Sequence, residues 1–92
     1  MKVRFSDGAI RFRLDRQEID SLMAGGHLMV SAGGITASLA TTAAKLSIVT
    51  SGNRISIGIP AGDSTADMSH PIVYSDEING TVISVELDLD TA

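Results

Sequence analysis

The sequence contains no cysteine and only three aromatic residues, one Tyr and two Phe. Without cysteine the chain has no disulfides, no thiolate metal sites and no cysteine nucleophile, and it suits a reducing compartment. Because aromatic residues are so few, a core has to be built mainly from Ile, Val, Leu, Met and Ala. Residues 1–92 are enough for one modest core and too few for two, which predicts a single domain.

The chain also lacks a long apolar run. Its first 16 residues carry five Lys or Arg, so no segment has the form of a signal peptide and we expect a cytoplasmic protein. Residues 21–44 carry no Asp, Glu, Lys or Arg, but four Gly and six Ser or Thr interrupt them. They therefore fail the requirement for about 20 predominantly apolar residues in a transmembrane helix. We expect no membrane partner.

Lys and Arg are missing from the last third of the chain. Five of the seven Lys and Arg residues lie in the first 16 positions, whereas residues 60–92 carry seven Asp or Glu and no Lys or Arg. A domain that binds nucleic acid normally shows a basic surplus, and the acidic half of this chain, with net charge −4, repels a polyanion. The charge distribution thus disfavours nucleic acid as a partner.

Four pairs of turn-forming residues divide the chain into hairpins: Asp7-Gly8, Gly33-Gly34, Gly52-Asn53 and Asn79-Gly80. A two-residue turn fixes which residues lie opposite each other, and in each hairpin this places apolar residues together on one face. The predicted pairs include Val3 with Phe12, Leu28 with Leu39, Ile48 with Ile57, Tyr74 with Val85, Val73 with Glu86 and Ile72 with Leu87. The pattern predicts a mainly β (α+β) protein of seven or eight antiparallel strands, without a parallel pair, in a small barrel or sandwich.

One short helix is expected after the second strand. Asp15 fits the N-cap position and Glu18, three residues later, completes a capping box. Leu14 and Ile19 are placed to form a hydrophobic staple across the helix start. Gly25-Gly26 then ends the helix after about nine residues, so the helix needs the sheet for stability.

The two ends of the chain carry opposite charges at the same two-residue period. The first hairpin sets Arg4 opposite Arg11 and Lys2 opposite Arg13, two pairs of like charge that destabilise an isolated hairpin. The last strand presents three carboxylates on one face, those of Glu86, Asp88 and Asp90. We predict that this strand pairs with the first or second strand, so that ion pairs close the sheet and fix its register.

Two groups of residues are candidates for a binding site. The basic face of the first hairpin (Lys2, Arg4, Arg11, Arg13) suits an external carboxylate, phosphate or protein partner, unless the acidic strand neutralises it. The loop at residues 61–71 carries Asp63, Asp67 and His70, but their spacing matches no metal motif. We therefore expect no metal, no cofactor and no catalytic residue.

The N-terminal residues also resemble a known family. Residues 2–5 (KVRF) and 10–15 (IRFRLD) are similar to the N-terminus of small bacterial proteins catalogued as a domain of unknown function. Residues 75–78 and 85–89 resemble later segments of that family, whose members tend to carry Lys where Leu87 stands. The resemblance implies a small soluble bacterial domain and supplies no catalytic residue.

Two functions of different classes remain open from the sequence. The first and favoured one is a non-enzymatic interaction or structural module that meets its partner through an open sheet edge or through the opposite charges of its two ends. The partner is either a second copy, in a homo-oligomer, or another protein. The alternative is a protein, conceivably an enzyme, that binds a small ligand or anion at the basic face or at the loop. A flat surface with a paired strand edge would favour the first function, and a concave pocket reaching Arg11 or His70 would favour the second.

Overall fold

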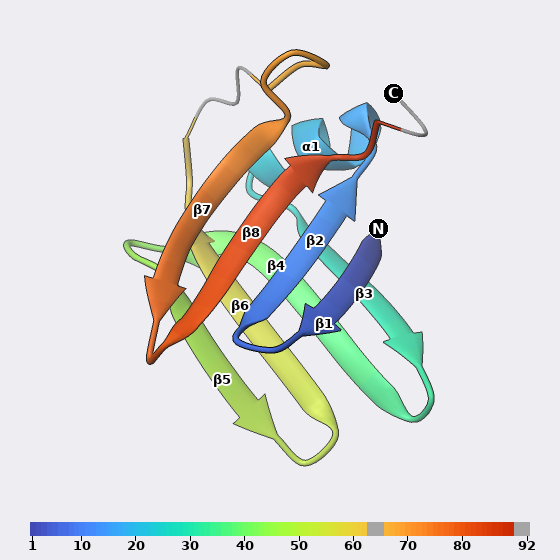
Figure 1. Ribbon diagram of the computed structural model, residues 1–92, viewed down its shortest axis with the longest axis vertical. Coiled ribbons are helices and arrows are strands. Elements are labelled where there is room, and N and C mark those ends of the chain that lie inside the picture. Colours follow the sequence, from blue (N-terminus) through green and yellow to red (C-terminus); the bar gives the residue numbers. More distant parts are fainter. Residues whose placement is uncertain (63–65, 90–92) are drawn as a thin grey trace.

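The computed structural model describes residues 1–62 and 66–89, apart from the side chains of residues 42 and 43. Within these residues the chain forms eight strands and one helix, shown in Figure 1. The elements are β1 (Lys2–Ser6), β2 (Ala9–Leu14), α1 (Arg16–Met23), β3 (His27–Ala32), β4 (Ile35–Ala43), β5 (Ser47–Ser51), β6 (Arg54–Pro60), β7 (Ile72–Ile78) and β8 (Thr81–Leu87). The prediction of a mainly β fold with one short helix after the second strand is confirmed.

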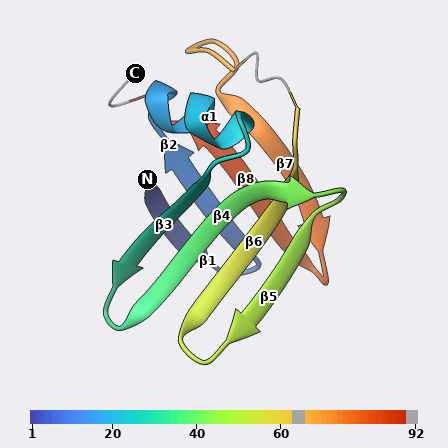
Figure 2. The ribbon, with the colours of Figure 1, turned by 180° about the vertical axis from the view of Figure 1, so that it is seen from behind.

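The strands form two sheets that face each other in a sandwich-like arrangement, with their strands crossing (Figures 1 and 2). Sheet A has the order β1-β2-β8-β7 and sheet B the order β3-β4-β6-β5. Each sheet is made of two hairpins whose second strands lie side by side at the centre, and the sheets do not close into a barrel. One member of each hairpin is therefore left at an edge.

The expectation that all pairs are antiparallel is wrong at the centre of both sheets. β2 runs parallel to β8, and β4 runs parallel to β6. The cause is that the two hairpins of a sheet have their turns at the same end, so their second strands run in the same direction. In sheet A the turns touch, because the N–H of Val82 donates to the Gly8 carbonyl at 2.9 Å.

The predicted registers are confirmed in hairpins β1–β2, β3–β4 and β5–β6, including Val3 opposite Phe12 and Leu28 opposite Leu39. Hairpin β7–β8 follows the prediction from Ile78 to Tyr74 and then departs from it. Ile72 lies opposite Glu86, and not Leu87, because the register shifts between Ile72 and Tyr74. The predicted pair of Val73 with Glu86 is wrong for the same reason. A bulge of this kind inserts one extra residue, which a strict alternation of side chains does not reveal.

Both sheets contribute to one hydrophobic core. Sheet A supplies Ile10, Phe12, Leu14, Ile83, Val85 and Leu87, and sheet B supplies Leu39, Ile57 and Ile59. Leu46 and two residues of α1 complete the cluster. As the composition indicates, aliphatic side chains fill this interior, with Phe12 the single aromatic residue among its buried members.

Helix α1 covers one end of the sandwich. Asp15 accepts a hydrogen bond from the N–H of Glu18 at 2.8 Å, and the Glu18 side chain accepts one from the N–H of Asp15 at 3.0 Å. This confirms the predicted capping box. Ile19 and Leu22 are fully buried beneath the helix. Within residues 1–62 and 66–89, no helix is long and apolar enough to cross a membrane.

Candidate functional site

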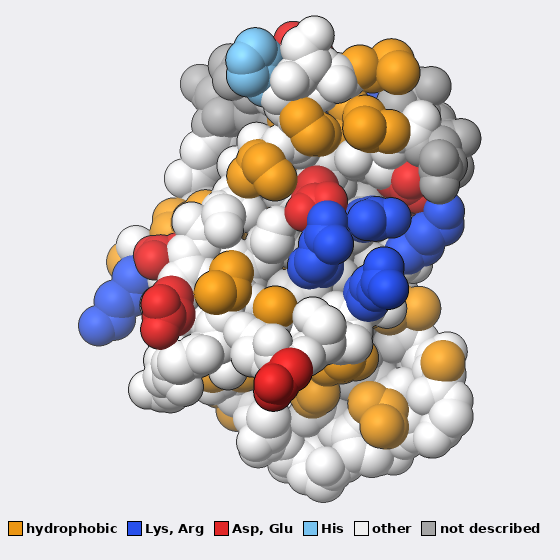
Figure 3. Space-filling model, viewed as in Figure 1, with side chains coloured by type: hydrophobic (Ala, Val, Ile, Leu, Met, Phe, Trp, Pro, Cys, Tyr) orange, Lys and Arg blue, Asp and Glu red, His pale blue; other side chains and the backbone are white. Residues whose placement is uncertain are grey.

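The basic face of the first hairpin lies on the outer surface of sheet A, where Figure 3 shows Lys and Arg side chains gathered around carboxylates. Parallel pairing of β2 with β8 sets Arg13 opposite Glu86. Arg11 Nη2 lies 3.0 Å from Glu86 Oε1, and Arg13 Nε lies 3.7 Å from the same oxygen. Ser84 donates a further hydrogen bond to Glu86 at 3.0 Å. The predicted ion pairs between the ends of the chain are confirmed.

A second carboxylate reaches the same hairpin from just beyond β8. Asp88 Oδ2 lies 2.8 Å from Lys2 Nζ, and the N–H of Asp88 donates to the Leu14 carbonyl at 2.8 Å. Asp88 is only 3% exposed, so this carboxylate belongs to the structure of the sheet. Asp90, the third predicted carboxylate, lies outside the described residues.

Arg4 differs from the other three cations of the basic face. It lies on β1 opposite Arg11 and is exposed to solvent. Within residues 1–62 and 66–89, no carboxylate lies within ion-pair distance of its guanidinium. Lys2, Arg11 and Arg13 share the two carboxylates of Glu86 and Asp88. Among residues 1–62 and 66–89, the four cations of the basic face therefore meet two carboxylates, and the cation left over is Arg4 on the edge strand.

Two hollows reach this surface. One, of about 160 Å³, is lined by Lys2, Val3, Arg4, Arg11 and Arg13. The other, of about 300 Å³, lies between Arg11, Arg13, Glu86 and the residues that follow β8. A concave surface at Arg11 is one of the features expected of an anion site.

A larger hollow was not predicted from the sequence. It is an apolar groove of about 460 Å³ between β1 and hairpin β3–β4, and its walls are Met1, Lys2, Val3, Phe5, Val30, Ala32, Ile35 and Ala37. Phe5 is 53% exposed and Ile35 is 48% exposed, although both belong to apolar faces of their hairpins. In Figures 1 and 3, hairpin β3–β4 extends past sheet A, so its end is left uncovered there.

Both strands beside this groove are edge strands. β1 ends sheet A, and β3 ends sheet B, on the same side of the sandwich (Figure 1). An edge strand presents unpaired backbone N–H and C=O groups along its open side. The groove thus combines an apolar floor with backbone groups able to accept another strand.

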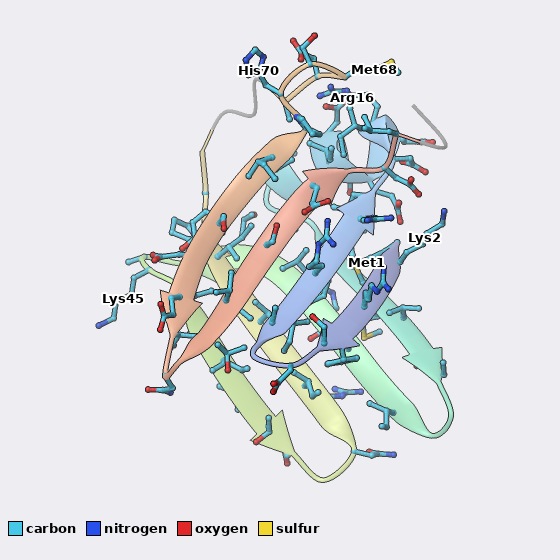
Figure 4. The ribbon with its side chains drawn as sticks, in the orientation of Figure 1. Met1, Lys2, Arg16, Lys45, Met68 and His70 are labelled. Carbon is cyan, nitrogen blue, oxygen red and sulfur yellow. The ribbon has the colours of Figure 1, made fainter. Side chains whose placement is uncertain are left out.

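His70, one of the loop candidates, lies away from the basic face, as the labels of His70 and Lys2 in Figure 4 show. Asp67 accepts hydrogen bonds from the N–H groups of His70 and Ser69, both at 2.8 Å, which lowers the pKa of Asp67 below its ordinary 3.8. His70 Nδ1 lies 3.8 Å from the Asp67 carboxylate, and both side chains are exposed. Asp63 lies outside the described residues. Across residues 1–62 and 66–89, no three His, Asp or Glu side chains gather to hold a metal ion.

Comparisons with known proteins add no relative. No family model matches the chain, and neither does any curated protein or any solved structure.

Proposed function

We propose that this protein is an interaction module that binds another polypeptide at the apolar groove between β1 and hairpin β3–β4. The observation that carries the proposal is the groove itself, about 460 Å³ of mainly apolar surface bordered by two open strand edges. Burying apolar surface drives most protein association, at about 25 cal/mol per Å². Phe5 and Ile35 supply such surface, since about half of each side chain is exposed.

Backbone geometry favours a polypeptide over a small apolar ligand in this groove. A small hydrocarbon would cover Phe5 and Ile35 but would leave the backbone groups of β1 unpaired. An added strand satisfies these groups while its side chains fill the groove, a mode of recognition used by several peptide-binding domains. A polypeptide therefore matches both parts of the site.

Photo-crosslinking tests this proposal. A photoreactive amino acid replaces Phe5 in the groove or, as the control, Val49, which is 60% exposed on β5 of sheet B. In cells that make the chain at its natural level, we expect position 5 to form one discrete adduct that disappears when Ile35→Ser is added. Equal adducts from both positions, or none from position 5, would contradict the proposal.

The surplus charge of the basic face supports a second candidate, binding of a small anion. Arg4 has no carboxylate partner among the described residues, and it lines the hollow of about 160 Å³ together with Arg11 and Arg13. Arg recognises phosphate and carboxylate through paired N–H donors. Titration with inorganic phosphate, followed by NMR of the Arg side-chain N–H groups, is expected to shift Arg4 and Arg11 and to spare Arg54. Equal shifts at Arg54 would mean that the binding is not specific to this face.

Two further parts of the proposal come from the sequence. We propose a cytoplasmic location, supported by the absence of cysteine. We also propose kinship with the bacterial domain of unknown function that residues 2–5 and 10–15 resemble.

A further inference from the structure

We propose that the partner is an extended segment of another protein that adds to β1 as a fifth strand of sheet A. The segment carries apolar side chains on one face and carboxylates on the other. This inference rests on the function proposed above and specifies the chemistry of the polypeptide that the groove accepts.

The side chains of β1 set the alternation that a neighbouring strand must follow. Val3 lies opposite Phe12, and Phe5 lies opposite Ile10. Because Phe12 and Ile10 are buried in the core, this face of β1 points between the sheets. Side chains of an adjacent strand alternate in the same way. Every second side chain of the added segment would therefore extend over Val30 and Ile35 in the groove. Only apolar side chains suit these positions.

The opposite face of β1 determines the charge of the segment. Lys2 and Arg4 lie there, and Arg4 has no ion-pair partner among residues 1–62 and 66–89. A carboxylate directly across from Arg4 would supply one, and a cation there would repel it. The chain already uses this chemistry on the other side of the hairpin, where Glu86 of β8 lies across from Arg13 of β2.

A second copy of the chain fits the site poorly. Antiparallel pairing of β1 with itself, centred on Arg4, sets Arg4 across from its own copy, which is destabilising. The other edge of sheet A, β7, is acidic, but its Asp76 lies opposite Ile83, which is fully buried and faces the core. If β7 of a second copy paired with β1, Asp76 would face the apolar groove. A charge buried there without a partner is costly, so a segment with acids on one face only is favoured.

Three peptides test the inference: (Glu-Val)₄, (Lys-Val)₄ and (Glu-Ser)₄. At pH 7 and low salt, we expect the unmodified protein to bind (Glu-Val)₄ and to bind the other two at least tenfold more weakly. Arg4→Glu is expected to weaken binding of (Glu-Val)₄ about two- to fivefold, the scale of one exposed charge pair. The matched control is Arg54→Glu, an exposed Arg on sheet B, and it is expected to leave the affinity unchanged. Binding of (Lys-Val)₄ as tight as that of (Glu-Val)₄, or no effect of Arg4→Glu, would overturn the inference.

Amide hydrogen exchange separates strand addition from contact by side chains alone. With (Glu-Val)₄ bound, we expect slower exchange of amides within residues 2–6, while the exchange of residues 47–51 of β5 does not change. Unchanged exchange in β1 would overturn strand addition.

The crosslinking experiment separates the two levels of the proposal. An Ile35-dependent adduct at position 5, combined with no binding of (Glu-Val)₄, would reject the acidic strand and keep the interaction module. An adduct of twice the mass of the chain would identify a second copy and reject the acidic segment. Absence of both the adduct and peptide binding would reject both proposals.

Discussion

Sheets A and B have the same strand arrangement, but the outer face of sheet A is charged and the centre of the outer face of sheet B is uncharged. The outer face of sheet A carries Lys2, Arg4, Arg11, Arg13 and Glu86, with ion pairs between β2 and β8. The outer face of sheet B carries small uncharged residues at its centre. One row of it runs Met29, Ser38, Ser56 and Val49 across all four strands. The shared core constrains the inner faces of both sheets, whereas the outer faces differ freely.

The connections between hairpins explain this difference. The hairpins of sheet B follow each other in the chain, with residues 44–46 between β4 and β5. Sheet A joins the first hairpin to the last, and Arg11 and Glu86 are 75 positions apart in the sequence. Closing the longer loop costs more chain entropy and leaves the register less constrained by the connection. We expect the ion pairs between β2 and β8 to supply that constraint in sheet A, and the short connection of residues 44–46 to supply it in sheet B.

The largest expected effect is on the free energy of unfolding, and it tests the hydrophobic core that the two sheets share. Phe12→Ala at the centre of sheet A is expected to lower the free energy of unfolding by about 3 to 5 kcal/mol, and Leu39→Ala in sheet B by about 2 to 5 kcal/mol. Both side chains are fully buried in one core, so chemical denaturation should show a single transition in each variant. Separate transitions for the two sheets would contradict a common core.

The second prediction concerns the ion pairs on the outer face of sheet A. Glu86→Ala leaves Arg11 and Arg13 without their carboxylate. Because both Arg side chains are more than one-third exposed, we expect a loss of only about 1 to 2 kcal/mol in the free energy of unfolding. Arg54→Ala on sheet B should change it by less than about 0.5 kcal/mol. Equal losses in the two variants would show that the ion pairs do not specify sheet A.

The third prediction uses the only tyrosine of the chain, which lies on β7, the edge strand of sheet A opposite to β1. Partial burial raises the pKa of Tyr74 above its ordinary 10.0, and the nearby Asp76 carboxylate raises it further. The neutral phenol is thus favoured in the folded protein. Its contribution to stability is present below pH 10 and is lost as the pH rises through the folded pKa. Asp76→Asn should lower the pKa of Tyr74 in an ultraviolet absorbance titration, and an unchanged pKa would contradict the contact.

The smallest expected effect is on stability at acid pH. It comes from Asp67, which lies in the connection between β6 of sheet B and β7 of sheet A. Its lowered pKa means that its contribution to stability is present above its unfolded pKa of about 3.8 and is lost as the pH falls through the folded pKa. NMR of the side-chain carboxyl carbon should place the pKa of Asp67 below 3.8. Asp67→Asn should remove this part of the acid dependence, and a pKa at or above 3.8 would contradict the described turn.

Local features of the fold were predictable from the sequence. Asn79 and Gly80 have positive φ angles of 52° and 79°, as the two-residue turn inferred from Asn-Gly requires. Asp15 and Glu18 formed the capping box because both partners lie within one helical turn. The ion pairs of Glu86 were predictable because its charge and period match those of Arg11 and Arg13.

Features that depend on how the hairpins assemble were not predictable. A hairpin pattern fixes the faces of β2 and β8 but not which way one hairpin lies beside another, so their parallel pairing was missed. The groove was not predictable for the same reason. The sequence places Phe5 and Ile35 on apolar faces of their hairpins, but it does not show where sheet A ends relative to hairpin β3–β4. The exposed fractions of Phe5 and Ile35 reveal the groove, and they are properties of the folded chain alone.

β1 and its groove form the proposed binding surface, and NMR chemical-shift mapping with (Glu-Val)₄ tests this most directly. Changes at the backbone amides are expected to gather in residues 2–6 and 30–37, on β1 and hairpin β3–β4, and to leave β5 unchanged. Changes centred on β5, or spread evenly over both sheets, would contradict it.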